Sequence, residues 1–248
     1  MVKCNDIPTG ARRDRVLAAD CFQTVILQTF LPFIQGKSAD LPPRPFLLTF
    51  DDGRLDSWTG ADSILKQLGF TAVIFVDVDP VDTRHPEYLL WKELQTMQQS
   101  GRWDVQLHAG RGHTFIRWGP GPDDYGPFYA YKRNGESFEG WKERAFGDIE
   151  WGQDQLAKHI SQYQPRAFAP PYGAYGQESW SPTCQPPTCT NDSRIPNTLL
   201  TWLTGRFHLV FTQDRSWFAK PGSTQPIGRF QLNRNTSLKQ LHDVLVGK

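Results

Sequence analysis

The sequence predicts an α/β fold, a distorted or incomplete (β/α) barrel with seven or eight parallel strands. Short apolar runs that suit buried strands alternate along the chain with helical stretches. Polar residues with metal-binding chemistry directly follow two of these runs. The 248 residues fit the length of about 200 to 250 residues at which such barrels form one domain. We therefore expect residues 1–248 to form a single domain around one core.

The first half of the chain supplies clear strand and helix signals. Residues 46–50, FLLTF, are five residues between Pro45 and an acidic turn, which favours a buried strand over a helix. A helix is expected over 56–68 and ends at Gly69, a residue that suits a left-handed C-cap. A second helix is expected over 90–100, and a strand over 103–107 follows it.

The second half contains two irregular insertions. Residues 117–140 are rich in glycine and proline and predict a long loop at the rim of the barrel. Residues 141–163 are expected to be mostly helical, and residues 177–197 form a second insertion. The stretch SLKQLHDVL has the apolar spacing of a terminal helix.

Asp51, Asp52 and Gly53 follow the first expected strand directly. In a barrel of parallel strands, the carboxyl ends of the strands are the edge at which functional groups gather. One carboxylate could bind a metal ion while its neighbour handles protons. The alternative is an ordinary turn, because Asp and Gly are residues that turns favour.

His108 and His113 lie in HAGRGH, after the strand expected over 103–107. Imidazole and carboxylate groups suit zinc and similar divalent ions, and three protein ligands with one open position are typical of a catalytic zinc site. Asp52, His108 and His113 could supply these three ligands. The alternative is a pair of solvated histidines in a loop.

A third motif, FAPPYG, covers residues 168–173. Its two prolines stiffen the backbone, and Tyr172 and Gly173 offer amide groups beside an aromatic ring. A rigid N–H group of this kind could stabilise a developing negative charge. An ordinary loop explains the same residues.

Taken together, these motifs resemble those of the NodB-homology polysaccharide deacetylases, the fourth carbohydrate esterase family. The resemblance covers about residues 41–245 and includes ILKQLGFTAVIFV, which looks like the helix and second strand of that family. Many members place the two histidines four residues apart, whereas His108 and His113 are five apart. This spacing resembles the branch that deacetylates biofilm poly-N-acetylglucosamine.

The resemblance implies a metal-dependent N-deacetylase of a polysaccharide that contains N-acetylglucosamine. Asp52, His108 and His113 would hold one divalent ion, zinc first and cobalt or nickel as alternatives. The ion would lower the pKa of water from about 15.7 toward roughly 7, and Asp51 would act as general base. The backbone N–H of Tyr172 would stabilise the oxyanion. Pro171, Tyr172 and Arg229 would contact the substrate.

Two departures from the family pattern concern the groups that assist the reaction. Ala169 stands where other deacetylases carry an arginine that helps the catalytic base. Its replacement is expected among three residues, Arg166, Arg229 and Arg234. Arg229 is favoured because it lies on an expected late strand near the same rim. The leucine-histidine pair that supplies the general acid has no clear counterpart, since His208 and His242 fit a strand and a helix instead.

Composition limits the partners. The net charge of +1, from 27 basic and 26 acidic residues, provides no field that would attract nucleic acid or anionic lipid. No apolar run approaches the roughly eighteen residues of a membrane span. We expect a monomer that works outside the cell or in the cell envelope after loss of an export signal, with a cytoplasmic location as the alternative. Cys184 and Cys189 would form a local disulfide in an oxidising compartment, and Cys4 and Cys21 could pair or stay free.

Two other functions fit the same residues. One is an amidohydrolase of similar fold that acts on a small amide and needs a closed pocket. The other is a catalytically weakened saccharide-binding module. Aromatic residues make up 13% of the chain, and one or two of the nine tryptophans could stack on sugar rings while the rest anchor the core or loops. The candidates for a cleft are Trp118, Trp141, Trp151, Trp180 and Trp217.

Overall fold

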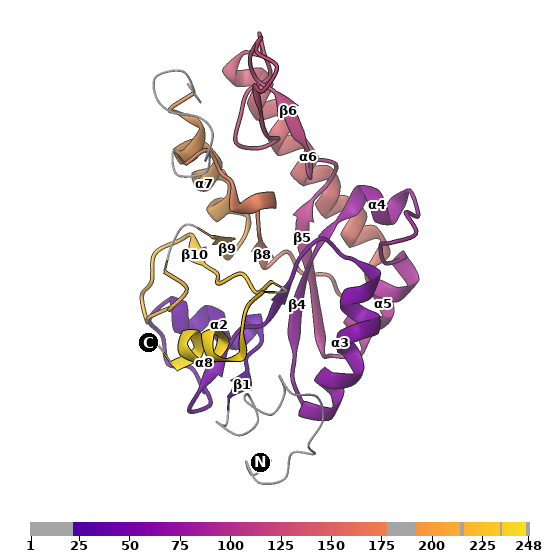
Figure 1. Ribbon diagram of the computed structural model, residues 1–248, viewed down its shortest axis with the longest axis vertical. Helices are drawn as coiled ribbons and strands as arrows, with labels where there is room; N and C mark the ends of the chain where they lie inside the picture. Colours follow the sequence, from indigo (N-terminus) through magenta and orange to yellow (C-terminus); the bar gives the residue numbers. More distant parts are fainter. Residues whose placement is uncertain (1–21, 178–191, 214–215, 234, 247–248) are drawn as a thin grey trace.

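A parallel β-sheet forms the centre of the computed structural model, which describes residues 22–177, 192–213, 216–233 and 235–246 (Figure 1). The strand order is β10-β9-β8-β5-β4-β3, and every neighbouring pair is parallel. A further strand, β1, pairs in parallel with β2, which directly precedes β3 in the chain. The six-stranded sheet curls into a half-barrel, so the predicted distorted, incomplete barrel is confirmed.

The strands that form these parallel pairs are mostly short. They are β1 (Gln23–Thr24), β2 (Pro45–Phe46), β3 (Thr49–Phe50), β4 (Ala72–Asp77), β5 (Trp103–Ala109), β8 (Ala167–Phe168), β9 (Leu209–Thr212) and β10 (Ile227–Gly228). The strand expected over 46–50 is interrupted between β2 and β3. If 45–50 counts as one interrupted strand, the described residues give seven parallel positions, the lower of the two predicted numbers.

The helices that surround the sheet match most of the expected positions. They are α2 (Leu27–Ile34), α3 (Leu55–Leu68), α4 (Val78–Asp82), α5 (Trp91–Gln99), α6 (Phe138–His159), α7 (Ile195–Arg206) and α8 (Leu238–Val246). Gly69 ends α3 with φ of 66°, as the left-handed C-cap predicts. α6 begins three residues earlier than predicted, because the Ser137 hydroxyl caps it by accepting the Gly140 N–H at 3.0 Å.

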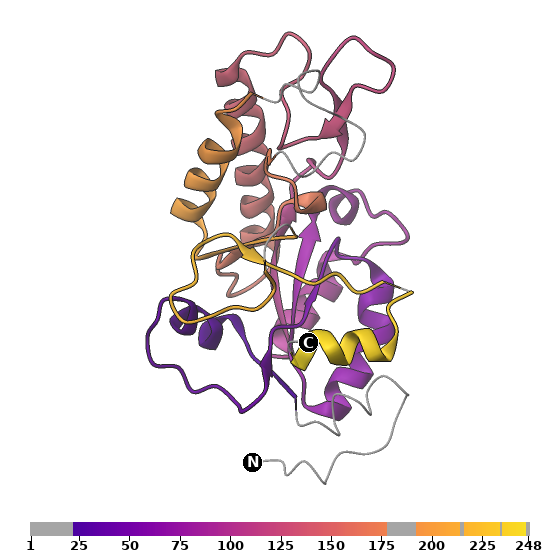
Figure 2. The same ribbon diagram turned by 60° about the vertical axis from the view of Figure 1, so that its left-hand side comes forward.

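The core lies on both faces of the sheet. Alternate residues of β4 point to opposite faces, so Ile74 belongs to one buried cluster and Phe75 to the other. The larger cluster is covered by α3, α5 and α6, and the smaller one by α2 (Figures 1 and 2). Burial of both faces explains why β4 (AVIFVD) and β9 (LVFT) are apolar along most of their length instead of alternating. Packing on both faces therefore holds the carboxyl ends of the strands in fixed positions.

The rim insertion contains regular β-structure that its glycine and proline content did not predict. Within the loop expected over 117–140, β7 (Tyr125–Pro127) pairs antiparallel with β6 (Phe115–Arg117). This ribbon stands at the top of Figure 1, beyond the carboxyl end of β5.

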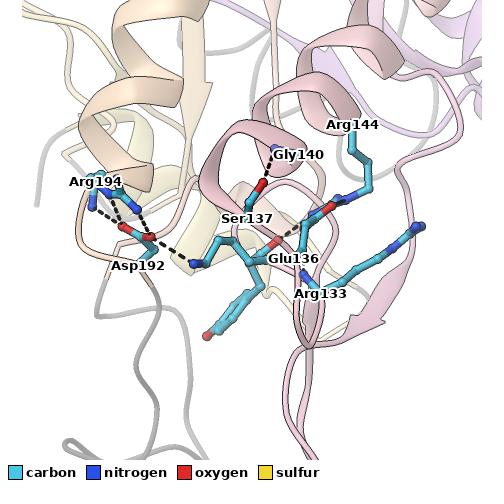
Figure 3. Close-up of polar contacts among 9 residues, drawn as sticks. Arg133, Glu136, Ser137, Gly140, Arg144, Asp192 and Arg194 are labelled. Carbon is cyan, nitrogen blue, oxygen red and sulfur yellow. Dashed lines mark hydrogen bonds and ion pairs between the residues drawn. The ribbon is translucent and has the colours of Figure 1, made fainter.

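Ion pairs attach the rim insertion to the helices behind it. Arg144 of α6 donates to both carboxylate oxygens of Glu136, at 2.7 and 2.8 Å (Figure 3). Asp192 lies between Lys132 at 3.1 Å and Arg194 at 2.6 Å. These contacts fix residues 128–136 relative to α6 and α7. In the described part of the chain, no helix combines the length and hydrophobicity needed to cross a bilayer.

Candidate metal centre and active site

The acidic turn after β3 is held in an unusual backbone conformation. Asp52 and Gly53 both have positive φ, at 72° and 76°, a region that Asp tolerates better than most residues and Gly adopts freely. The Asp52 carbonyl accepts the Asp77 N–H at 3.1 Å, and the Gly53 carbonyl accepts the Leu89 N–H at 2.9 Å. The turn is therefore fixed against the end of β4, and the two carboxylates separate.

His108 is a residue of β5, so the strand end expected at Leu107 is wrong. The strand runs two residues further than expected, because its pairing with β4 continues to Ala109. The His108 ring is buried, and its Nδ1 lies 2.6 Å from the carbonyl oxygen of Ala169. Since a carbonyl can only accept, Nδ1 carries the proton and Nε2 presents its lone pair. Burial, together with the nearby His113, lowers the pKa of His108 and keeps the ring neutral.

His113 is oriented in the same way by a carboxylate. Its Nδ1 lies 3.5 Å from Oδ2 of Asp77, the last residue of β4. Burial lowers the pKa of His113, but the Asp77 hydrogen bond and the charge of Asp52 outweigh that effect, so the pKa is raised overall. Histidines that bind metal commonly donate their second ring nitrogen to a carboxylate or a carbonyl. Both imidazoles therefore have the orientation that frees Nε2 for a ligand.

The Nε2 atoms of both histidines approach the same carboxylate oxygen. Oδ1 of Asp52 lies 3.5 Å from Nε2 of His108 and 3.7 Å from Nε2 of His113. The three ligand atoms all lie within 4.8 Å of one another. Ligand atoms that each lie about 2.0 to 2.2 Å from one zinc ion are at most about 4.4 Å apart, and the separations of 3.5 and 3.7 Å satisfy this limit. Asp52, His108 and His113 therefore fit a divalent metal ion in both chemistry and spacing.

A buried polar atom beside this group supports the same conclusion. The second oxygen of Asp77, Oδ1, is buried and has no hydrogen-bond partner among the described residues. Burial raises the pKa of Asp77, and His113 opposes the shift. A buried carboxylate is costly unless nearby positive charge compensates for it. A cation between the two imidazoles and Asp52 would supply that charge.

Asp51 accepts hydrogen bonds from Arg229. The guanidinium donates two parallel hydrogen bonds, Nη1 to Oδ1 at 2.7 Å and Nη2 to Oδ2 at 2.8 Å, and Nη1 also lies 3.2 Å from the Thr49 hydroxyl. Burial alone would raise the pKa of Asp51, but Arg229 and the imidazoles outweigh it and lower the pKa. Asp51 is thus an oriented, ionised carboxylate next to the metal-binding group.

The structure separates the three candidate arginines. Arg229 directly follows β10 and reaches the carboxyl edge of the sheet, as predicted. Arg166 precedes β8 at the opposite edge, where it pairs with Asp104 at 3.4 Å. Arg234 lies outside the described residues. Among the three, Arg229 is the one seen beside Asp51.

The FAPPYG motif forms a tight turn whose aromatic ring covers a histidine. Pro171–Gly173 are a single 3₁₀ turn, η1, in which Tyr172 has φ of 61°. The Tyr172 ring stacks on His113 with centroids 4.9 Å apart and an angle of 13°. Phe115 of the rim ribbon contacts the same ring at 4.7 Å. Tyr172 therefore borders the group formed by Asp52, His108 and His113, as expected from its position after β8.

The two histidines considered as a general acid lie elsewhere. His208 is exposed and precedes β9, so it stands at the amino edge of the sheet. His242 belongs to α8, the expected terminal helix, where its Nδ1 lies 3.8 Å from Oδ1 of Asp243. Both placements agree with the strand and helix interpretations of these residues.

Most of the tryptophans considered for a cleft serve the core. Trp141 is fully buried, Trp118 is half-buried and stacks on Tyr131, and Trp151 lies under the Arg111 guanidinium at 3.8 Å. Trp217 is 45% exposed and is the one described member of the set that is open to solvent to that extent. Trp180 and the four cysteines, Cys4, Cys21, Cys184 and Cys189, lie outside the described residues.

Asp77 is a residue of the site that sequence reasoning missed. A signal was present, because Asp77 ends an apolar run, AVIFVD, in the same way that Asp51 and Asp52 follow the first strand. The carboxyl ends of neighbouring parallel strands meet at one edge. Applying that rule to the second strand would have placed Asp77 beside Asp52.

The fold and the site define a class of protein: an α/β half-barrel with a candidate divalent-metal centre at the carboxyl edge of its strands. Within that class, the polysaccharide deacetylase family model matches residues 38–183, more than half of the chain. The chain belongs to the polysaccharide deacetylase family. The resemblance predicted from FLLTFDDG, HAGRGH and APPYG is thereby confirmed.

Solved structures share the fold. A de-N-acetylase from Aggregatibacter actinomycetemcomitans is 21% identical, with a TM-score of 0.74 over 93% of this chain and 86% of that one. IcaB from Ammonifex degensii is 21% identical, with a TM-score of 0.70 over 96% and 93% of the two chains. The deacetylase domain of BpsB from Bordetella bronchiseptica is 21% identical, with a TM-score of 0.65 over 86% and 80%. A comparison with curated protein sequences gave no match.

Proposed function

We propose that this protein is a metal-dependent N-deacetylase that removes acetate from a polysaccharide containing N-acetylglucosamine. The observation that carries the proposal is the Asp51–Arg229 pair beside the group formed by Asp52, His108 and His113. The Asp51–Arg229 pair supplies an oriented base, and the group of three side chains supplies ligands for a metal ion that acts as a Lewis acid. Together, a base and a Lewis acid can activate water for attack on an amide.

Asp52, His108 and His113 would hold one divalent ion, with zinc preferred and cobalt or nickel as alternatives. When bound, such an ion polarises the amide carbonyl and lowers the pKa of water to about 7. Asp77 and the Ala169 carbonyl orient the two imidazoles for this purpose. The partly exposed side chains of Asp51, Asp52 and His113 make the group accessible to a substrate.

Asp51 is the proposed general base. Arg229 keeps its carboxylate ionised and points it by two hydrogen bonds. Asp51 takes a proton from water as the water oxygen bonds to the acetamide carbon, and the carbonyl becomes an oxyanion. The backbone N–H of Tyr172, on its rigid turn beside Pro171, donates a hydrogen bond to this oxyanion.

Asp51 also returns the proton in this proposal. As the carbon–nitrogen bond breaks, the leaving amine needs a proton. His108 and His113 have their Nδ1 atoms directed at the Ala169 carbonyl and at Asp77. Asp51 holds the proton taken from water, so it can protonate the amine and regain its charge for the next turnover.

The substrate class rests on the family and on the names of the structural neighbours, a de-N-acetylase among them. The five-residue spacing of His108 and His113 favours the branch that acts on biofilm poly-N-acetylglucosamine. Such a substrate implies work outside the cell or in the envelope. We also propose that residues 1–248 act as one domain and as a monomer, with Pro171, Tyr172 and Arg229 contacting the substrate.

Acetate release tests the proposed function. The protein is incubated with fragments of chitin, peptidoglycan and poly-β-1,6-N-acetylglucosamine, with and without a chelator, and then with zinc, cobalt or nickel added back. Acetate release that a chelator abolishes and a metal restores is the expected result. Tight saccharide binding with no acetate release under any metal would favour the weakened binding module. Turnover confined to small amides would favour the amidohydrolase.

A further inference from the structure

The loop between the two histidines is held by one carboxylate of a distant helix. Asp148 of α6 accepts three consecutive backbone N–H groups, from Gly110 at 3.1 Å, Arg111 at 2.7 Å and Gly112 at 3.2 Å. Its two oxygens divide the bonds, Oδ1 to Arg111 and Oδ2 to the two glycines. These residues are the middle of HAGRGH, so one side chain determines the backbone path between His108 and His113.

A buried phenol fixes the carboxylate in turn. The Tyr129 hydroxyl donates to Oδ2 of Asp148 at 2.5 Å. Tyr129 is only 1% exposed. Burial and the neighbouring Asp148 charge raise the pKa of Tyr129 well above its usual value, so the phenol stays a donor. The Tyr129 carbonyl accepts the indole N–H of Trp141 at 2.9 Å, which connects the tyrosine to the core of α6.

Close packing leaves the loop little freedom. A Cβ atom added to Gly110 would lie 2.3 Å from the Asp148 carbonyl, and one added to Gly112 would lie 2.6 Å from the Tyr129 ring. Real Cβ atoms do not approach other atoms so closely. On its other side, the Gly110 carbonyl accepts the Asp79 N–H at 2.9 Å. The loop is therefore clamped between α6 and the start of α4.

We propose that Asp148 is a positioning residue that sets the separation of His108 and His113 for metal binding. His108 is fixed by its strand, whereas His113 follows the clamped loop. Without the Asp148 carboxylate, three amide groups lose their acceptor and the five-residue connection can take other paths. The hydrogen bonds of the Asp148 side chain go to the loop backbone and to Tyr129, and not to the histidine rings. The inference rests on the proposed function, which supplies the metal ion, and adds Asp148 of α6 to the residues that support the metal site.

Metal affinity and the cobalt spectrum of Asp148→Asn, Asp148→Ala and Tyr129→Phe test the inference. Outer-shell partners of metal ligands typically change affinity by about 10- to 100-fold. We expect a weakening in that range for Asp148→Ala, measured by titration of the metal-free protein with zinc, and a smaller one for the other two variants. The visible absorption of bound cobalt should shift, because the histidines change their geometry.

The matched control is Glu136→Gln, which weakens another loop-to-α6 anchor away from the histidines. It should lower thermal stability and leave the zinc affinity and the cobalt spectrum unchanged. If the Asp148 variants lose stability but bind zinc as the parent does, Asp148 is merely structural and the inference is overturned. If the parent binds zinc and the variants bind it weakly while no acetate is released, the positioning role stands and the proposed function fails.

Discussion

Arg229 and Asp51 form a two-point ion pair between residues 178 positions apart in the chain. The Arg229 side chain is largely buried and that of Asp51 is partly exposed, with exposed fractions of 11% and 30%. The family pattern that this chain resembles places an arginine before the two prolines, where Ala169 stands here. Arg229, which directly follows β10, lies beside Asp51. We propose that Arg229 gives the base the assistance that the proline motif lacks.

Two substitutions of Arg229 should separate the effect of its positive charge on activity from the effect of its planar hydrogen-bonding geometry. Arg229→Lys keeps the charge but loses the planar fork, and Arg229→Gln loses both. We expect kcat to fall by about 10- to 100-fold in the glutamine variant, since a hydrogen bond to a charged group contributes ~1.5–3 kcal/mol. The kcat of the lysine variant should lie between those of the parent and the glutamine variant. Steady-state kinetics provide the measurement, and Arg166→Gln, at the opposite edge of the sheet, should have no effect.

Asp51→Asn should remove the base and leave the metal-binding group intact. General base catalysis contributes about 10²- to 10⁴-fold, so acetate release should drop by that factor. Metal content, measured by elemental analysis, should match the parent protein because Asp51 is not one of the three ligands. Asp40→Asn, at an exposed site, is the control. Full activity in the Asp51 variant would refute the assigned role.

Asp77→Asn should weaken metal binding although it replaces none of the three proposed ligands. The Asp77 carboxylate accepts from Nδ1 of His113, and an amide in its place loses the negative charge that favours the bound cation. We expect zinc affinity to fall by about 10- to 100-fold. Isothermal titration of the metal-free protein measures the change. An unaltered affinity would show that Asp77 does not orient His113.

Glu136 gives a stability prediction with a defined pH window. Burial raises its pKa, but the hydrogen bonds from Arg144 outweigh burial and lower it from the ordinary value of 4.5. A lowered pKa means that the stabilisation is complete above about pH 4.5 and is lost as the pH falls through the folded-state pKa. Glu136→Gln should reduce the free energy of unfolding by ~1–3 kcal/mol at pH 7.

Denaturant unfolding of the parent and the Glu136→Gln variant at several pH values checks this prediction. The difference between the two proteins should be constant from pH 6 to 8 and should shrink below pH 4.5. A difference that grows on acidification would contradict the assigned direction.

Phe115→Ala should affect long substrates more than short ones. The Phe115 ring is 43% exposed and contacts Tyr172 beside the metal-binding group, so a sugar next to the reacting one can stack on it. Aromatic contacts contribute ~0.5–1.5 kcal/mol, which predicts a KM about 2- to 10-fold higher for oligomers. Ile26→Ala is the matched control, since Ile26 is 40% exposed and borders Thr71 and Arg102 at the amino ends of β4 and β5. Equal KM values for the parent and the Phe115 variant would exclude the contact.

Local signals in the sequence were sufficient for several strands, for the four helices α3, α5, α6 and α8, and for the candidate metal ligands. Gly69 ends its helix as expected because a left-handed C-cap is a property of a single residue. Asp52, His108 and His113 were found because each follows or ends an apolar strand. The parallel sheet then brings such positions to one edge whatever the details of packing.

The tertiary structure alone decided which partners these residues meet. Arg229 reaches Asp51, Asp77 reaches His113, and Asp148 reaches the loop between the histidines, across separations of 36 to 178 residues. Such pairs depend on how helices and strands pack over long distances, and hydrophobic periodicity carries no information about them. β7 and the last residue of β6 were expected to be loop for the same reason, because glycine and proline content describes local flexibility and not cross-strand pairing. The amino-acid sequence therefore determined the chemistry available at the rim, and packing determined its orientation, ionisation and support.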